Sequence, residues 1–528
     1  MGAAAGDRDY DVLVCGLGPV GLLLALLLGR AGVSVLAIDA APEPFMLPRA
    51  AVVDDEVLRI FQSAGVAGEI LAASQIQEDV SFVPERGNPY TILRPVDGIH
   101  GHPPLVSIHQ PTLERTLADA LAAEPTVEMR RGVRLEDFEQ DGSGIEAKLR
   151  SQDDGESMIR ASWLVGCDGG PSWVRRLLGI EFGGFTFRQQ WLVVDVLVDR
   201  PVERVPHPHF FGDWRRPIVS LPMSPGRHRW EWMLHPGEDP EPFTGEESVR
   251  QRLEPWFADG GFEVERAVVY TFHARAATRW REGRVFLAGD AAHLMPPFAG
   301  QGFSSGARDA ANLAWKLAAV TRGAPESLLG SYESERRPHV QAMTRLALLM
   351  GRFIQTTDRK VAAIRDAFLG TLDRTGIAEL IRERIKPVPA YDDGAFAEGP
   401  HRLPFKRSVG SQFPQPEVVA DGESFLLDEL LGRGWSAVAL DASAAGRLGE
   451  SGFPVLVAGR DFEDGSGVVA EWMERFGASW VLLRPDRFVF AAGTTEGDAI
   501  ERSLGVLHRQ AGNAPAAGPE RRPEAVAA

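Results

Sequence analysis

The stretch YDVLVCGLGPVGLLLALLLGRAGVSVLAIDA, residues 10–40, decides the fold. Its apolar start predicts a β-strand, and a Gly-x-Gly-x-x-Gly turn follows. The run of Leu, Ala and Gly from Val20 to Arg30 predicts a buried helix that stops at Gly32, and a second apolar strand ends in Asp39. Strand, helix and strand together predict a βαβ unit and therefore an α/β fold.

Each glycine of the turn has its own physical role. Gly16 allows the sharp turn, Gly18 lets the backbone approach a pyrophosphate at the helix N-terminus, and Gly21 lets helix and strand pack closely. An acid such as Asp39 can bind both hydroxyls of a ribose, so NAD or FAD fits better than NADP. The motif predicts a Rossmann-like dinucleotide-binding domain but does not choose between NAD and FAD.

The composition argues against several classes of protein. The 528 residues are too many for one core, and 44% hydrophobic with 24% charged residues are typical of a globular chain. A net charge of −17 disfavours nucleic acid or an anionic membrane surface as a partner. We expect a cytoplasmic protein, because we find no signal peptide and no apolar run near the ~20 residues of a membrane span. The two cysteines, Cys15 and Cys167, predict neither a disulfide nor a metal site.

The residue pattern changes along the chain and divides it into units. The βα pattern of the start returns after a β-rich region dense in Trp, Phe and Pro, and strands alternate with helices again after a Pro-containing linker. The order of the last strands hints at a thioredoxin-like domain, which without cysteine cannot carry out dithiol chemistry. We predict a discontinuous dinucleotide-binding domain (8–80, 105–183 and 279–385), an inserted β-sheet substrate domain (81–104 and 184–278), a linker (386–404), a thioredoxin-like domain (405–510) and a disordered tail (511–528).

Two further motifs lie where a bound flavin would need them. In GCDGGPSWVRR a strand ends, and Asp168 and Gly169 make a turn before a helix, either beside a ligand or as a plain Asp-Gly turn. Arg49 in LPRA and Gln110 in HQPTLE each stand just before a helix, where they can bond to cofactor oxygens or lie at the surface. In VFLAGDAAHLMPPFAGQG a strand ends in Gly289 and Asp290, whose carboxylate is placed to accept hydrogen bonds from the hydroxyls of a ribityl chain. The glycines after Pro297 open a helix whose N-terminus favours the negative charge of a reduced flavin. These motifs favour FAD over NAD.

Together these motifs resemble the single-component FAD-dependent aromatic hydroxylases of the p-hydroxybenzoate hydroxylase fold, over about residues 8–385. The segments AGDAAHLMPPFAGQGFSSGARDAANLAWKL, RRP and RWEWML look most like the 3-(3-hydroxyphenyl)propionate hydroxylase branch, to whose thioredoxin-like C-terminal domain the part after residue 405 is similar. Asp39 departs from the Glu of many relatives, which affects only the geometry of the ribose contact. By resemblance the FAD-binding residues are Gly16, Gly18, Pro19, Val20, Gly21, Asp39, Arg49, Gln110, Asp168, Gly169, Gly289, Asp290, Pro297, Gly300, Gln301 and Gly302.

The resemblance implies a monooxygenase. NADH or NADPH reduces FAD, the reduced flavin adds O₂ to form a C4a-hydroperoxyflavin, and one oxygen atom passes to a phenolic ring. Because the flavin carries the reactive oxygen, no protein nucleophile and no metal are expected, and we assign no catalytic role to His293. The expected substrate is a small aromatic, a 3-(3-hydroxyphenyl)propionate-like phenol. A larger aromatic secondary metabolite of the polyketide type stays open as the alternative.

The substrate side of the molecule is less defined. In RHRWEWML, strand alternation places Trp230 and Trp232 on one face, which suits either a planar phenol or a packed sheet core. Arg216 can bind a substrate carboxylate or lie at the surface. Because no residue reveals the oligomeric state, a homodimer stays open.

Other classes of function fit the sequence less well. A flavin-dependent halogenase would need a lysine in the N-terminal region, and the first lysine is Lys148. An NAD dehydrogenase would leave the two later motifs unexplained. The non-enzymatic alternative is a flavoprotein that binds FAD and a small aromatic without turnover.

Overall fold

The computed structural model describes residues 9–44, 46, 49–85, 89–93, 98–151, 155–257, 261–375, 390–397 and 408–512. Most of the predicted linker (386–404) and nearly all of the predicted disordered tail (511–528) lie outside the described residues. The last ten residues of the predicted dinucleotide-binding domain, up to residue 385, also lie outside them. The predicted limits between domains stay predictions.

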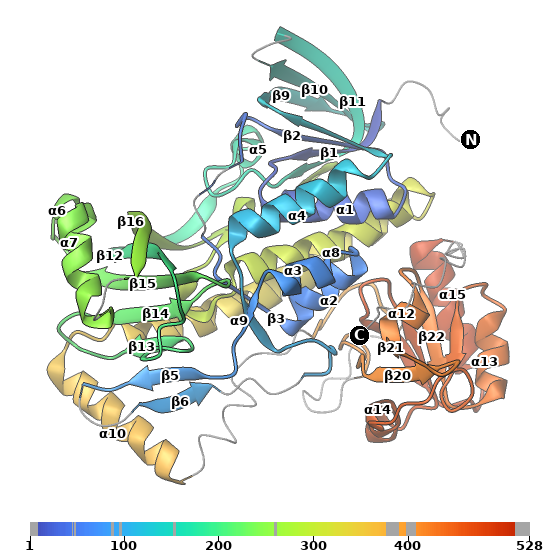
Figure 1. Cartoon of the computed structure of the whole chain (residues 1–528). Helices are drawn as coiled ribbons and strands as arrows, with labels where there is room; N and C mark the ends of the chain where they lie inside the picture. Colours follow the sequence, from blue (N-terminus) through green and yellow to red (C-terminus); the bar gives the residue numbers. More distant parts are fainter. Residues whose placement is uncertain are drawn as a thin grey trace.

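The opening stretch forms the expected βαβ unit. Strand β1 (Tyr10–Cys15) pairs in parallel with β2 (Val35–Asp39), and α1 (Pro19–Arg30) connects the two. On its other side β1 pairs in parallel with β11 (Gly155–Gly166), which in turn pairs with β18 (Val285–Leu287). Segments far apart in the sequence therefore complete one sheet, as Figure 1 shows. Its other strands are β8 (Val127–Arg131), β9 (Val133–Gln140), β10 (Ile145–Ser151) and β17 (Arg281–Glu282).

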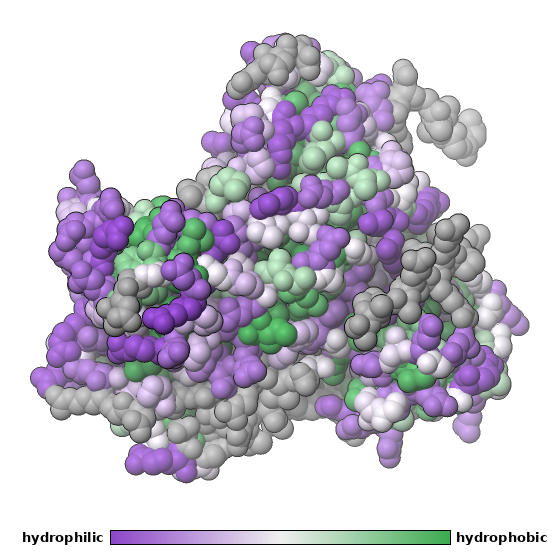
Figure 2. All heavy atoms as spheres, viewed as in Figure 1, coloured by the Kyte–Doolittle hydropathy of each residue, from purple (hydrophilic) through white to green (hydrophobic). Residues whose placement is uncertain are grey.

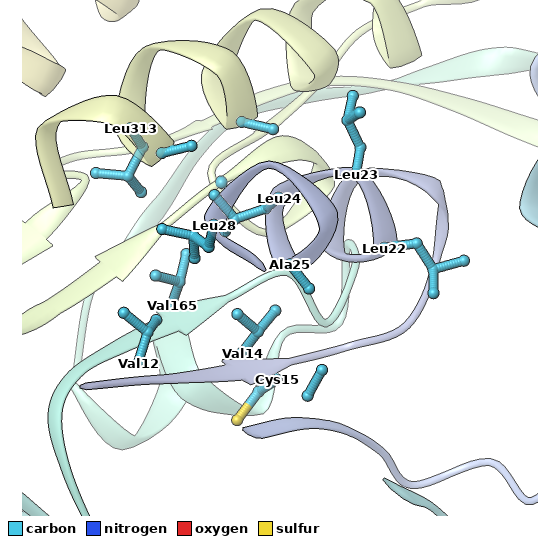
Figure 3. Close-up of a cluster of buried hydrophobic side chains, with 14 of the residues drawn as sticks. Val12, Val14, Cys15, Leu22, Leu23, Leu24, Ala25, Leu28, Val165 and Leu313 are labelled. Carbon is cyan, nitrogen blue, oxygen red and sulfur yellow. The ribbon is translucent and has the colours of Figure 1, made fainter. Parts of the chain in front are cut away.

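The core of this unit lies between the sheet and two helices. The apolar helix α1 packs against the long helix α8 (Gly302–Thr321). In Figure 3, Leu24 and Leu28 of α1 lie beside Val165 of the sheet, with Leu313 of α8 nearby. All four side chains are fully buried, and burying each aliphatic side chain contributes about 1.5–3 kcal/mol. The Leu-rich sequence of α1 is explained by burial on nearly every side.

A second, mixed sheet stands beside the first. Its strand order is β19-β16-β12-β15-β14-β13-β5-β6, and its two longest strands, β12 (Phe182–Val198) and β16 (Phe262–Ala277), are antiparallel neighbours. Strand β19 (His293–Leu294) belongs to the loop after β18, so this sheet holds one side of that loop. The remaining strands are β5 (Val80–Val83), β6 (Tyr90–Leu93), β13 (His209–Phe211), β14 (Ile218–Pro222) and β15 (Arg227–Leu234).

Short strands and helices cover these two sheets. A small sheet has the order β3-β7-β4, and the single turns η1 (Glu254–Trp256), η2 (Gly289–Ala291), η3 (Pro297–Ala299) and η4 (Glu326–Gly330) lie between longer elements. The strands are β3 (Val52–Asp54), β4 (Gln75–Ile76) and β7 (Leu105–Ser107). The helices are α2 (Asp55–Ser63), α3 (Ala67–Ala72), α4 (Gln110–Ala122), α5 (Trp173–Leu177), α6 (Glu241–Thr244), α7 (Glu246–Leu253), α9 (Ser331–Ile354) and α10 (Arg359–Thr375).

Residues 408–512 form a C-terminal unit, drawn in orange to red in Figure 1, beside α2 and α8. Its four-stranded sheet has the order β23-β22-β24-β25, with one parallel and two antiparallel pairs, as expected for a thioredoxin-like domain. Its elements are β20 (Glu417–Ala420), β21 (Glu423–Leu426), α12 (Leu427–Leu431), β22 (Ser436–Ala439), α13 (Ala442–Gly449), β23 (Val455–Val457), α14 (Val468–Phe476), β24 (Trp480–Leu483), β25 (Val489–Gly493) and α15 (Ala499–Ala511).

The surface is mostly hydrophilic on the face drawn in Figure 2, with small hydrophobic patches between charged and polar residues. Within the described part of the chain, no helix has both the length and the apolar character needed to cross a membrane. Among the same residues, no three His, Cys, Asp or Glu side chains gather closely enough to hold a metal ion.

Candidate functional site

Two glycines of the turn after β1 are required by the fold, and a third is not. A Cβ on Gly16, which has a φ of +108°, would lie 2.4 Å from the carbonyl oxygen of Cys167. A Cβ on Gly21 would lie 1.9 Å from the carbonyl oxygen of Gly16. A Cβ on Gly18 would meet nothing within 4 Å. The space in front of Gly18 fits a pyrophosphate that approaches the N-terminus of α1, where Pro19 and Val20 begin the helix.

Asp39, at the end of β2, fastens this turn. One carboxylate oxygen accepts a hydrogen bond of 2.7 Å from the backbone N–H of Leu17, and the other accepts one of 2.8 Å from Ala41. A carboxylate has about four acceptor positions, so two backbone donors leave room for a ribose hydroxyl. Asp39 can thus position the turn and bind the sugar with one side chain.

Three predicted residues from distant segments meet at a second point. The side-chain oxygen of Gln110 accepts hydrogen bonds of 2.8 Å from the backbone N–H groups of both Arg49 and Ala50. The Arg49 guanidinium reaches across to Asp290, with 3.8 Å between Nη1 and Oδ2. Partial removal from water raises the pKa of Asp290, and the charge of Arg49 opposes this shift. The Asp290 side chain is still 38% exposed, so a ligand can reach it. Gln110 therefore shapes the segment that brings Arg49 to Asp290.

Asp168 has one oxygen committed to the fold and one without a partner. Its Oδ2 accepts hydrogen bonds from the backbone N–H groups of Trp173 (2.6 Å) and Val174 (3.0 Å) at the start of α5. Its Oδ1 is buried and contacts no donor among the described residues. Burial raises the pKa of this carboxyl. A buried acceptor without a donor costs free energy, and a ligand hydroxyl would satisfy it.

The loop from Gly289 to Gly302 carries the other predicted residues. Gly289 and Gly300 have φ values of +59° and +63°, a conformation that favours glycine, and Gly169 has a φ of +77°. Pro297 is exposed, and α8 starts at Gly302 with no side chain capping its first N–H groups. These free donors, the open space at Gly18 and the unpartnered oxygen of Asp168 fit FAD.

Asp309 of α8 supports this loop, although the sequence motifs did not predict a role for it. Its Oδ2 accepts a hydrogen bond of 3.1 Å from the backbone N–H of Gly289 and lies 2.6 Å from His293 Nε2, while its Oδ1 accepts one of 2.9 Å from Arg336. Burial alone would raise the pKa of Asp309, but His293 and Arg336 hold it below its ordinary value. His293 is 1% exposed and therefore holds the loop from inside. The adjacent charges of Arg308 and Asp309, in a helix rich in small and apolar residues, were the available signal.

An aromatic cluster joins the same loop to the second sheet. Phe298, next to Pro297, lies 6.1 Å from Trp191 and 5.7 Å from Phe272 between ring centroids. Met233 of β15 belongs to this cluster, since it lies opposite Trp191 on the neighbouring strand. The inner face of the sheet is thus aromatic where it meets the candidate flavin site.

The predicted substrate residues lie elsewhere. Trp230 and Trp232 are buried in a separate core on the opposite face of the same strand, where Trp230 packs against Trp256. The two Nη atoms of Arg216 donate to Glu238 at 2.7 and 2.9 Å. This pair lowers the pKa of Glu238 to about 2, although burial opposes the shift. That these three residues contact the substrate stays a prediction. The packing of the two tryptophans favours the sheet-core interpretation, and Arg216 is paired with Glu238.

Comparisons with known proteins match most of the chain. Residues 9–347 match the family described as FAD binding domain, and residues 456–505 match the HcaD C-terminal domain. The chain is 37% identical to the 3-(3-hydroxy-phenyl)propionate/3-hydroxycinnamic acid hydroxylase of Mycolicibacterium gilvum, over 92% of this chain and 89% of that protein.

Two solved structures are similar over nearly the whole chain. Aklavinone-11 hydroxylase, in a complex with FAD and aklavinone, has a TM-score of 0.77 at 27% identity, covering 96% of this chain and 99% of that one. Anhydrotetracycline hydroxylase from Streptomyces rimosus has a TM-score of 0.76 at 26% identity, covering 96% of this chain and 100% of that one.

Proposed function

We propose, because this chain belongs to the FAD binding domain family and is an FAD-dependent aromatic hydroxylase, that its substrate is a 3-(3-hydroxyphenyl)propionate-like phenol. NADH or NADPH is the proposed reductant and O₂ the proposed oxidant. The observation that carries this proposal is the similarity to the Mycolicibacterium gilvum hydroxylase, which extends through the flavin domain, the second sheet and the C-terminal unit.

The residues of the chain have distinct roles in this proposal. Gly18 admits the pyrophosphate, and Asp39, Asp168 and Asp290 bind hydroxyl groups of the cofactor, with Arg49 paired to Asp290 beside them. FAD, when bound, supplies the redox and oxygen-transfer chemistry. The protein supplies position, an electrostatic field from the N-terminus of α8, and exclusion of water.

The aromatic cluster around Phe298 is the proposed wall of the substrate site. Trp191 and Phe272 stack on each other and each meets Phe298 edge-on, so their rings define an apolar boundary beside the loop that begins α8. A phenol ring gains about 0.5–1.5 kcal/mol from a well-oriented aromatic neighbour beyond its burial. The same boundary would keep water from the reacting atoms.

A larger aromatic metabolite of the polyketide type is the second candidate substrate. The likeness to aklavinone-11 hydroxylase and anhydrotetracycline hydroxylase over 96% of this chain supports it. The lower sequence identity to those two proteins is the reason for placing it second.

The first experiment measures NADH and NADPH oxidation by the purified yellow protein in air, with and without 3-(3-hydroxyphenyl)propionate, together with its ring-hydroxylated product. We expect stimulated oxidation with matching product, and no product from 3-phenylpropionate, which lacks the activating hydroxyl. Stimulation that yields only hydrogen peroxide would favour a different phenol, such as a polyketide. A purified protein without flavin would contradict the proposal.

The remaining expectations belong to the same proposal. We place the enzyme in the cytoplasm without a nucleic-acid partner, in line with the net charge of −17. A homodimer is the assembly to test, and light scattering of the flavin-loaded protein distinguishes it from a monomer.

A further inference from the structure

We propose that Gln412, a residue of the C-terminal unit, is a positioning residue for the turn that begins α8. It acts through Glu56 and Arg308 on Gln301, and so connects the C-terminal unit to the flavin. The inference rests on the proposed function in one respect, the placement of the Gly300–Gln301–Gly302 turn beside the flavin ring.

Arg308 fixes the side chain of Gln301. Its Nη1 donates to Gln301 Oε1 at 3.0 Å, and its Nη2 donates to Asp54 Oδ2 at 2.7 Å. The amide nitrogen of Gln301 donates to the same Asp54 oxygen at 3.2 Å. Gln301 is the residue directly before α8, so the two bonds hold the start of the helix in one orientation.

The third arm of Arg308 leads to the C-terminal unit. Its Nε donates to one carboxylate oxygen of Glu56, and the other oxygen accepts a hydrogen bond of 2.8 Å from the amide nitrogen of Gln412. The guanidinium is planar, so its three donors cannot be re-aimed separately. A change in how Gln412 holds Glu56 must therefore alter the bonds to Asp54 and Gln301.

Burial makes this arrangement rigid. Asp54, Glu56 and Arg308 are each 2% exposed, while Gln412 is 4% and Gln301 7% exposed. The carboxylates of Asp54 and Glu56 share one guanidinium. Burial alone would lower the pKa of Arg308, but the two negative charges raise it. The uncharged donor of Gln412 stabilises the remaining negative charge. Without it, Glu56 would lose one of its hydrogen-bond donors.

The start of α8 is where this orientation matters. No side chain caps the first N–H groups of this helix, and none of its first-turn residues is acidic. These donors and the positive end of the helix dipole favour an anionic, reduced flavin. A displaced turn weakens that interaction and lowers the reduction potential of bound FAD. More of the electrons taken from NADH then reduce O₂ to hydrogen peroxide, and fewer lead to hydroxylated product.

The test compares Gln412→Leu with Gln415→Leu. Gln415 is 1% exposed, lies in the same segment and also bonds outside the C-terminal unit, to Gln62 Oε1 (2.9 Å) and the carbonyl oxygen of His100 (2.7 Å). No bond from Gln415 reaches Glu56 or Arg308 among the described residues. Both changes remove a buried amide, so both lower stability, but only Gln412→Leu interrupts the path to Gln301.

Four quantities are measured on the FAD-loaded full chain: the visible spectrum of the flavin, its reduction potential, product formed per NADH consumed, and hydrogen exchange at residues 301–305. For Gln412→Leu we expect a shifted spectrum, a lower potential, faster exchange and product per NADH reduced by about 2- to 30-fold. For Gln415→Leu we expect values close to those of the wild type.

Equal effects of the two variants, or a Gln412→Leu protein that matches the wild type, would overturn the proposal. If Gln412→Leu does not fold, the isosteric Glu56→Gln takes its place, with the same expected and overturning results. Failure of the proposed function appears separately, as a wild type that binds no FAD or hydroxylates no phenol. Hydrogen exchange still tests the path to Gln301 in that case, because it needs neither cofactor nor substrate.

Discussion

Gly18 and Gly21 stand three residues apart in one turn, but they are glycine for different physical reasons. Gly21 is required by the fold, because a Cβ there would collide with the carbonyl oxygen of Gly16 at 1.9 Å. Gly18 has extended backbone angles that any residue adopts, and a Cβ there meets nothing within 4 Å. The fold therefore does not require a glycine at position 18. A ligand does, because a side chain there would block its approach to the protein backbone.

The two glycines therefore give opposite predictions. Gly18→Ala should weaken FAD binding by about 10- to 100-fold, the equivalent of one hydrogen bond to a charged phosphate, while leaving the stability of the FAD-free protein nearly unchanged. Gly21→Ala should lower the free energy of unfolding of the FAD-free protein by about 1–3 kcal/mol through overpacking. Fluorescence titration with FAD and urea denaturation measure the two effects. A destabilised FAD-free Gly18→Ala protein would contradict this assignment.

At the level of strands and helices, the sequence predicted which elements exist better than which face of each one functions. The βαβ unit and the strand RHRWEWML followed from local patterns, and both are present. Alternation separates the two faces of β15 but says nothing about which face meets the flavin domain, because that depends on strands distant in sequence. Trp191, on the neighbouring strand β12, occupies the face toward Phe298 instead of Trp230.

Trp191 and Trp230 make a matched pair, since both are fully buried in the same sheet. Trp191→Phe should raise the KM for the phenol by about 2- to 10-fold, because it removes aromatic contacts at the proposed substrate wall. Trp230→Phe should leave KM unchanged, and each variant should lower the free energy of unfolding by about 1–3 kcal/mol. Steady-state kinetics with a coupled product assay decides. A raised KM for Trp230→Phe alone would return the substrate to the other face.

Across the whole molecule, helix α8 connects the flavin domain to the C-terminal unit, as Figure 1 indicates. The sequence allowed the fold of each part to be predicted, because strands, turns and glycine motifs are local. No sequence pattern predicted that Glu335 of α9 forms ion pairs with both Lys316 of α8 and Arg484 of the C-terminal unit. Such partners are far apart in the chain and follow no spacing rule. The polar residues that join the units were therefore missed, whereas Asp168 and Asp290 stood out within their motifs.

Arg484 gives a direct test of how firmly the C-terminal unit is attached. It is fully buried and donates to both carboxylate oxygens of Glu335, at 2.9 and 2.8 Å, and these contacts help hold the pKa of Glu335 low against the effect of burial. Arg484→Met removes one partner of a buried pair and should lower the free energy of unfolding by about 3–5 kcal/mol. We expect the C-terminal unit of this variant to unfold at a lower urea concentration than the one that releases FAD. Far-UV circular dichroism records the unfolding, and flavin fluorescence records the release of FAD.

The control for Arg484 is Arg447→Met. Its pair with Glu501 lies at the surface of the same unit, where the two side chains are 27% and 54% exposed. Solvent screening makes such a pair contribute little to stability, so both probes should follow the wild-type curve closely. If the two variants unfold alike, with circular dichroism and flavin fluorescence changing together, then Arg484 does not attach the unit. The contacts of α8 and α9 with the C-terminal unit would in that case be a consequence of apolar packing alone.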